Sequence, residues 1–326
     1  MAGLAIYLLL PSLTRVLASW PRLRTLDQVW LAVALAAEVA SFTCTFALQR
    51  LALQTRQWFS VVTAGLSGNS VSGIVPGGAA AGAGLQFELL SHAGFDTDAA
   101  AGALTTFSLL EVGALLALPV VALPAVLAGT AVSPGLMRTA LLGLGMFCLL
   151  AIAGVVVLKT DRPLAAVGRA AQALRNRITR RRPPLTGLDT RLLSERDTIR
   201  SVLGHNWWQA LLLTVGRLGF DFGCLLAALR ATGTHPQHAL VLLAYAAANV
   251  IELVPVTPGG LGLVEASLTG LLVLAGVHAG DAILATLAYR LASYWLPLCA
   301  GPPAYLLYRH RYGRWHARPG IENAAR

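Results

Sequence analysis

Long apolar segments separated by short polar connections dominate the pattern along this chain. A helix needs roughly 20 mainly apolar residues to cross the hydrocarbon core of a bilayer. The pattern therefore predicts helices that cross a membrane, the first of them short and the third and sixth long, with prolines that predict kinks or an interfacial end. The predicted spans are Leu4–Leu17, Val29–Leu48, Ala99–Leu127, Leu136–Leu158, Trp207–Leu229 and Ala282–Tyr308.

Two further apolar segments, residues 59–90 and 239–277, are broken in the middle by Pro-Gly-Gly. Proline removes a backbone donor, and Pro-Gly ends a helix that runs into it. The arms on either side have 12 to 16 residues, and several reach only about 18–24 Å, which is less than the ~30 Å core. We therefore expect re-entrant hairpins, with two short tilted spans as the alternative for the second segment. The break residues are Pro76, Gly77 and Gly78 in the first segment and Pro258, Gly259 and Gly260 in the second.

The two broken segments resemble each other beyond the break itself. Asn69 precedes the first break and Glu88 follows it, while Asn249 precedes the second and Glu265 follows it. Interrupted apolar segments in corresponding halves of a membrane chain are the best sequence indication of a transporter-type binding site. The sequence therefore predicts an inverted repeat. The alternative is two unrelated helix breaks in a chain rich in glycine and alanine.

The composition excludes an ordinary soluble domain. Of the 326 residues, 56% are hydrophobic and 12% are charged, and the mean hydropathy is +0.65, whereas about 25% of residues are charged in a typical soluble domain. The sequence predicts an all-α polytopic membrane protein with about six full transmembrane helices plus two re-entrant half-helix hairpins. Its expected parts are an N-terminal membrane half, a basic cytoplasmic loop, a C-terminal membrane half and a basic tail, at residues 1–158, 159–206, 207–308 and 309–326.

Chemical motifs are few. The four cysteines are scattered singly, with neither metal-ligand spacing nor the pattern of a disulfide framework. The chain also lacks the nucleophile-elbow, zinc-peptidase and P-loop motifs. We therefore expect no cofactor, no metal site and no enzymatic activity.

Basic residues predict how the chain is oriented in the membrane. Residues 159–200 hold eleven Lys and Arg against four Asp and Glu, and residues 309–326 hold five against one. Since basic residues favour the cytoplasmic side, we expect a multi-pass protein of the cell membrane with both termini in the cytoplasm. Within residues 164–182, helically spaced apolar residues beside arginines predict an amphipathic helix on anionic lipid. Nothing in the loop supports binding to nucleic acid.

Besides Arg15 and Arg138, which lie near the ends of their spans, eight charged residues fall inside the predicted membrane segments. A charge at the bilayer centre costs about 2.5–3.5 kcal/mol, so each needs a partner or water. Arg217 and Asp221 are four residues apart and are predicted to pair on one helix face. Arg290 is predicted to pair with Glu265 or Glu252, or to bind an anionic ligand. The other three are Glu38, Glu88 and Glu111.

The half-helices that begin after the two breaks supply a second electrostatic element. Their N-termini, after Gly78 and near Leu261, would have unpaired N–H groups and the positive end of the helix dipole. Two such ends near the midplane, with Arg290 close by, predict a site for a phosphate or a carboxylate.

Two stretches near the C-terminus, TPGGLGLVEASLTGLL and ATLAYRLASYWLP, resemble the lysylphosphatidylglycerol synthase transmembrane-region family, also called flippase-like integral membrane proteins. The upstream SGNSVSGIVPGGAAAGAG and QRLALQ are similar to the same family. The resemblance implies a polytopic inner-membrane domain that moves a lipid with a polar headgroup between leaflets. The large soluble synthase domain of the lipid-aminoacylating members is not found here, so neither aminoacyl transfer nor a lysyl-lipid substrate is expected. The family motif covers Asn69, Pro76, Gly77, Gly78, Pro258, Gly259, Gly260, Gly262, Glu265 and Arg290.

We therefore expect a lipid flippase or transporter for a phospholipid or a polyprenyl-phosphate-linked lipid, with an anionic headgroup. The alternatives are a non-transporting membrane partner of a lipid or cell-envelope synthase, and a membrane enzyme that acts on lipid. The candidate substrate-binding residues lie at the two breaks and among the intramembrane charges. They are Asn69, Pro76, Gly77, Gly78, Glu88, Asn249, Pro258, Gly259, Gly260, Gly262, Glu265, Arg290, Arg217 and Asp221.

Overall fold

The computed structural model describes residues 26–75, 78–127, 188–252 and 258–313, together with isolated helical positions between 141 and 152. Helices make up all the regular structure of this part of the chain. The predicted span Leu4–Leu17, the amphipathic helix within 164–182 and the break residues Pro76 and Gly77 lie outside the described residues. The predicted span Leu136–Leu158 contains only the isolated positions.

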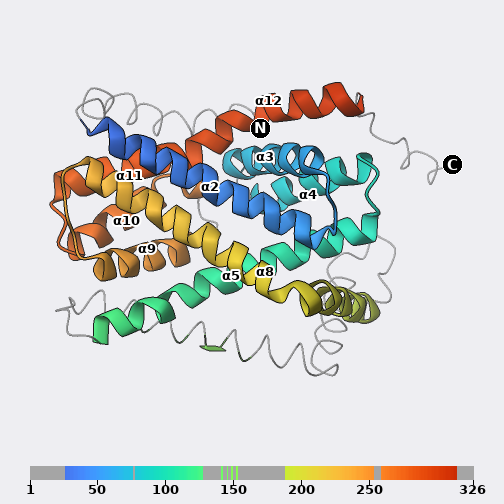
Figure 1. Cartoon of the computed structure of the whole chain (residues 1–326), viewed down its shortest axis with the longest axis horizontal. Coiled ribbons are helices and arrows are strands. Elements are labelled where there is room, and N and C mark those ends of the chain that lie inside the picture. Colours follow the sequence, from blue (N-terminus) through green and yellow to red (C-terminus); the bar gives the residue numbers. More distant parts are fainter. Residues whose placement is uncertain are drawn as a thin grey trace, which may run out of the picture.

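Three long helices run along the molecule and cross one another (Figure 1): α2 (Gln28–Ala52), α5 (Thr97–Leu127) and α8 (Leu188–Ala231). α2 and α8 lie side by side. The backbone N–H of Asp27 donates to the carbonyl of Ala231 (3.1 Å), so α2 begins beside the point where α8 ends.

By length and composition, three stretches of the described residues suit a membrane crossing: Gln28–Ala52, Asn206–Ala231 and Ala279–Tyr312. They contain the second, fifth and sixth of the predicted spans. α5 covers the third as one helix of 31 residues. The apolar part of α8 begins at a kink, since the φ of Asn206 is −111°. These helices support a location in a membrane.

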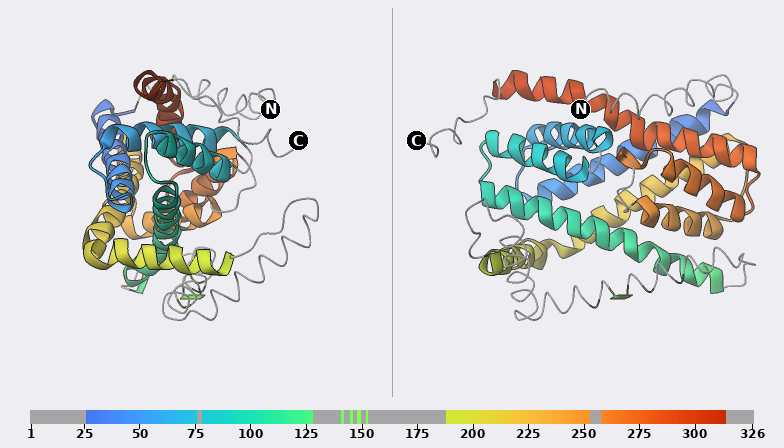
Figure 2. Two further views of the ribbon diagram at one scale, coloured as in Figure 1. Left: turned by 90° about the vertical axis from the view of Figure 1, so that its right-hand side faces the viewer. Right: turned by 180° about the vertical axis from the view of Figure 1, so that it is seen from behind.

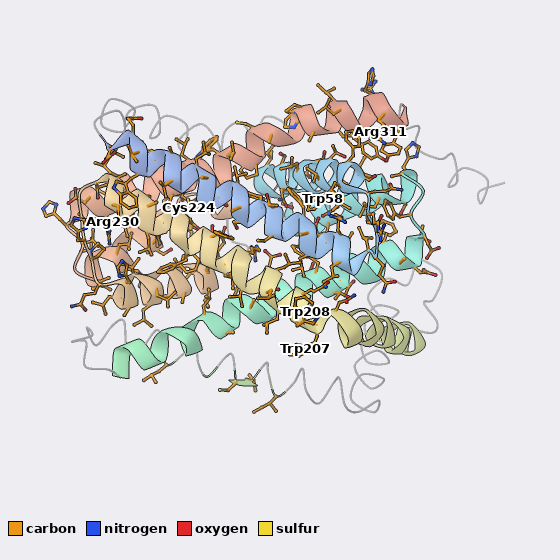
Figure 3. All side chains as sticks on the ribbon, in the orientation of Figure 1. Trp58, Trp207, Trp208, Cys224, Arg230 and Arg311 are labelled. Carbon is orange, nitrogen blue, oxygen red and sulfur yellow. The ribbon has the colours of Figure 1, made fainter. Side chains whose placement is uncertain are left out.

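Side chains at the ends of the apolar part of α8 suit a membrane interface. Trp207 and Trp208 lie at one end and are 60% and 50% exposed, while Arg230 lies at the other end (Figure 3). The Arg230 guanidinium stacks over the Trp30 ring, 5.7 Å from its centroid. Tryptophans and basic residues of this kind anchor helices at the lipid headgroups.

The last apolar stretch is a continuous helical path with a π-helical turn in the middle. α11 (Ala279–Arg290) leads into η2 (Leu291–Trp295) and then into α12 (Leu296–Tyr312). Pro297 follows the turn and has no backbone N–H, so the carbonyl four residues earlier lacks its helical partner. A π-turn is a common cause of a bend at such a point, and it lets the helix continue.

Both segments predicted to be broken are pairs of short helices. α3 (Trp58–Ile74) packs against α4 (Gly78–His92), and α9 (His238–Glu252) packs against α10 (Leu263–Leu274). The second break contains one short turn, η1 (Pro258–Gly260). The sequence prediction of helix, break and helix is therefore confirmed at both places.

Backbone angles explain why glycines follow the proline of the second break. Gly259, Gly260 and Gly262 have φ angles of 56°, 68° and 81°. These values lie in the left-handed region, which residues with a Cβ disfavour. Three such residues within four positions suit a tight turn directly before α10.

The two pairs of short helices lie towards opposite ends of the long axis (Figure 2). Each pair contributes to a hydrophobic core of its own. The core around α9 and α10 includes Leu225, Ala244 and Leu272, while the core around α3 and α4 includes Ala64 and Leu90. α3 extends as far as η1, so the first pair reaches the break of the second pair.

Candidate functional site

A cavity of about 190 Å³ lies next to the place where the two pairs meet. Its walls come from α2, α3, α5, α8, α9, α11 and η2, and they are mostly polar although the surrounding helices are apolar. Its charged residues are Glu38, Glu111, Arg217, Asp221, Glu252 and Arg290.

Arg290 has the most contacts of these charged side chains, and it is only 4% exposed. Its Nε donates to Glu265 Oε1 (3.1 Å), and its Nη1 lies 3.5 Å from Glu252 Oε1. Its Nη2 donates to the carbonyl of Gly259 in η1 (2.8 Å). Arg290 therefore pairs with both acids that the sequence offered as alternatives, and it also fixes the second break.

Glu265 lies in the first turn of α10 and contacts two groups. One carboxylate oxygen accepts from Arg290, and the other accepts from the backbone N–H of Gly262 at 2.5 Å. The carboxylate thus caps the start of its own helix. The sequence prediction of unpaired N–H groups that bind an anion is wrong at Gly262, because Glu265 already occupies that donor.

Tyr294 joins the two breaks, and the sequence prediction missed it. Its hydroxyl donates to the carbonyl of Gly73 at the end of α3 (2.9 Å), and the Arg290 guanidinium lies 4.6 Å from its ring centroid. Its ring also fills the space beside Gly259, where an added Cβ would lie 2.4 Å from ring carbon Cε2. The available signal was its position four residues after Arg290, on the same side of a helix.

Arg217 and Asp221 do not form the direct ion pair that their spacing predicted. Arg217 Nη2 lies 2.6 Å from Glu111 Oε1, so the ion pair joins α8 to α5. Asp221 instead accepts hydrogen bonds from the hydroxyls of Tyr245 and Tyr289, the latter at 3.0 and 3.2 Å. The prediction was wrong because both side chains find better-placed partners on neighbouring helices than on their own.

The remaining predicted residues divide between the cavity and its surroundings. Asn69 and Asn249 line the cavity, and the Asn249 side chain donates to the carbonyl of Tyr245 (2.9 Å). Gly78 is buried at the first residue of α4. Glu88 is exposed on α4 and does not line this cavity.

Carboxyl groups outnumber guanidinium groups around the cavity. Four carboxyl groups and two guanidinium groups line it, and Glu265 adds a fifth carboxyl group through Arg290. Both guanidinium groups are already paired with carboxylates. An anion that reaches either arginine therefore meets a guanidinium that already has a carboxylate partner, and a cation meets an excess of acceptors.

The comparisons with known proteins agree with the motifs at the breaks. A family model described as the lysylphosphatidylglycerol synthase TM region matches residues 1–301. A UPF0104 membrane protein of Methanothermobacter thermautotrophicus is 32% identical over 96 residues. That match covers 29% of this chain and 27% of the relative, so the chain spans little more than a quarter of the relative's length. No solved structure matches the chain.

Proposed function

The chain belongs to the lysylphosphatidylglycerol synthase transmembrane-region family, and from this premise we propose that it moves a polar-headed lipid between the leaflets of a membrane. The substrate class is a phospholipid or a polyprenyl-phosphate-linked lipid. The observation that carries the proposal is the cavity of about 190 Å³ lined by six charged side chains inside an apolar helical protein. Charges are expensive at such a depth unless they serve a polar ligand, a proton or one another.

The proposal includes a multi-pass topology with about six full transmembrane helices. In it the two pairs of short helices are re-entrant hairpins, which together form an inverted repeat. The short helices have 17, 15, 15 and 12 residues, so each is about 18–26 Å long and shorter than the ~30 Å hydrocarbon core. The position of the pairs towards opposite ends of the long axis supports entry from opposite sides. The basic loop and tail support cytoplasmic termini.

Arg290 is the proposed headgroup contact. Of its two carboxylate contacts, the one with Glu252 is the longer at 3.5 Å, and Glu252 is the more exposed acid at 42%. A lipid phosphate can therefore replace Glu252 while Glu265 and the carbonyl of Gly259 keep the guanidinium in place. The bidentate geometry of arginine suits such an exchange.

The test uses the purified full-length chain in phosphatidylcholine vesicles that carry a trace of fluorescent phosphatidylglycerol. We expect the chain to move the label between leaflets, and we expect Arg290→Gln to slow that movement at least about tenfold, which corresponds to ~1.4 kcal/mol. Arg290→Lys keeps the charge but loses the forked geometry of the guanidinium, so its rate should fall between those of the wild type and Arg290→Gln. The matched control is Arg230→Gln, since Arg230 stacks on Trp30 away from the cavity.

Yield and monodispersity in detergent show whether each variant is folded. A wild-type rate equal to that of empty vesicles would contradict lipid movement. A monodisperse Arg290→Gln protein with the normal rate would remove this cavity from the mechanism. In the first case the alternative is a non-transporting partner of a lipid or cell-envelope synthase, and assays for modified lipid would test the enzyme alternative.

A further inference from the structure

Glu38 is a carboxyl residue of the cavity that the proposed headgroup contact does not use and that is almost completely buried. Glu38 lies on α2, lines the cavity and is only 2% exposed. Its oxygen Oε2 has no hydrogen-bond partner among the described residues. A buried carboxyl oxygen without a hydrogen-bond donor lowers stability by roughly 1–3 kcal/mol or more. Its presence here therefore needs a physical reason.

The groups around Glu38 include a second carboxyl group, a weak donor and two tyrosine hydroxyls that already donate elsewhere. The carboxyl of Asp221 lies within hydrogen-bonding reach of Glu38, as does the thiol of Cys224, a weak donor on α8 (Figure 3). The hydroxyls of Tyr245 and Tyr289 both donate their hydrogen bonds to Asp221. Two ionised carboxylates can only accept, so a hydrogen bond between Glu38 and Asp221 requires one proton.

We propose that Glu38 and Asp221 form a proton-binding carboxyl pair, through which lipid movement is coupled to a proton gradient. This inference rests on the proposed lipid movement. The bound proton is on Glu38 and points to Asp221, because both oxygens of Asp221 already accept from tyrosine hydroxyls. Both carboxyl groups line the cavity, so the proton is exchanged through the cavity.

Loss of the proton alters an ion pair between two long helices. With both carboxyl groups ionised, the cation that interacts with both is Arg217, which lies one turn before Asp221 on α8. The two carboxylates then compete with Glu111 for that guanidinium, and the tie between α8 and α5 weakens. Proton release is thereby linked to the packing of two walls of the cavity. The titratable and charged groups that face Glu38 are Asp221, Cys224 and Arg217 from α8, Tyr245 from α9, Tyr289 from α11 and, beyond Arg217, Glu111 from α5.

The first measurement detects the proton without any lipid movement. In the purified full-length protein, a protonated carboxyl group gives an infrared carbonyl band that shifts in heavy water. We expect that band at neutral pH and expect it to disappear in Glu38→Gln. Asp98→Asn is the matched control, since Asp98 is exposed in the first turn of α5 and should leave the band unchanged. A band that persists in monodisperse Glu38→Gln would overturn the proton site.

The second measurement tests the coupling. Vesicles with fluorescent phosphatidylglycerol receive a pH gradient in sodium-free buffer, and an impermeant quencher reports the label in the outer leaflet. With one proton coupled per lipid, a gradient of about one pH unit shifts the final leaflet ratio about tenfold. Glu38→Gln should still move lipid but should give the same ratio with and without the gradient.

The outcomes separate this inference from the proposed function. A wild-type leaflet ratio that ignores the gradient, with lipid still moving, overturns the coupling. A wild-type protein that keeps the infrared band but moves no lipid overturns the proposed function and the coupling together, while it supports the proton site. Loss of the band in Glu38→Gln together with loss of the gradient response supports the whole inference.

Discussion

Arg290 and Tyr294 hold the two breaks together from a single helical path. Arg290 contacts η1 through the Gly259 carbonyl and α10 through Glu265, and Tyr294 contacts α3 through the Gly73 carbonyl. The partners of Arg290 could be predicted from the sequence, because an arginine inside an apolar segment demands an acid. The role of Tyr294 could not be predicted, since a tyrosine in an apolar helix can face the lipid as readily as it can pack in a core.

Gly259 is constrained both by close packing and by a positive φ angle. Its φ is 56°, and an added Cβ would lie 2.4 Å from Tyr294 Cε2 and 3.0 Å from the Gly73 carbonyl oxygen. We expect Gly259→Ala to lower the free energy of unfolding by about 1–3 kcal/mol. Denaturant titration in detergent micelles measures this change.

Gly84→Ala is the control for that substitution. Gly84 is an exposed residue within α4, and an added Cβ there has no atom within 4 Å. The alanine should stabilise the helix by up to about 1 kcal/mol. Equal effects at the two glycines would show that the close contact at the second break does not determine stability.

At the scale of elements, the sequence predicted where helices break better than it predicted which side chains meet. The breaks follow from local chemistry, because proline lacks a donor and the glycines at 259, 260 and 262 adopt positive φ. The partner of Arg217 depends on which helix packs beside α8. Spacing of four residues offered Asp221, whereas the neighbouring helix α5 supplied Glu111. Such a choice between partners is made by tertiary packing, which periodicity does not encode.

The ion pair between α8 and α5 makes a measurable prediction. A double-mutant cycle on Arg217 and Glu111 should give a coupling energy of about 0.5–3 kcal/mol, because the two side chains contact each other and are partly buried. The same cycle on Arg217 and Asp221 should give a smaller value. Unfolding of the alanine variants in micelles supplies the data, and a larger coupling with Asp221 would contradict the observed pairing.

At the scale of the whole molecule, the polar cavity lies next to the place where the two pairs of short helices meet. Apolar helices surround that level, and aromatic and basic side chains such as Trp207, Trp208 and Arg230 lie at the ends of α8's apolar part. The sequence could predict this layout in outline, because both interrupted segments are readable and the helix lengths follow from hydropathy. It could not predict the cavity itself, since the cavity depends on residues from seven elements.

The last prediction concerns the proposed entry of the two hairpins from opposite sides of the membrane. His92 ends α4 and His278 precedes α11, both are exposed, and the two helix pairs lie towards opposite ends of the molecule. If both pairs are re-entrant, single cysteines at these positions should react with an impermeant maleimide from opposite faces of the membrane, His92→Cys from the cytoplasm. The four native cysteines must first be replaced, and a cysteine in the basic tail reports the cytoplasmic face. Labelling of both positions from one face would exclude the inverted repeat, because hairpins that enter from the same side cannot be related by an axis in the membrane plane.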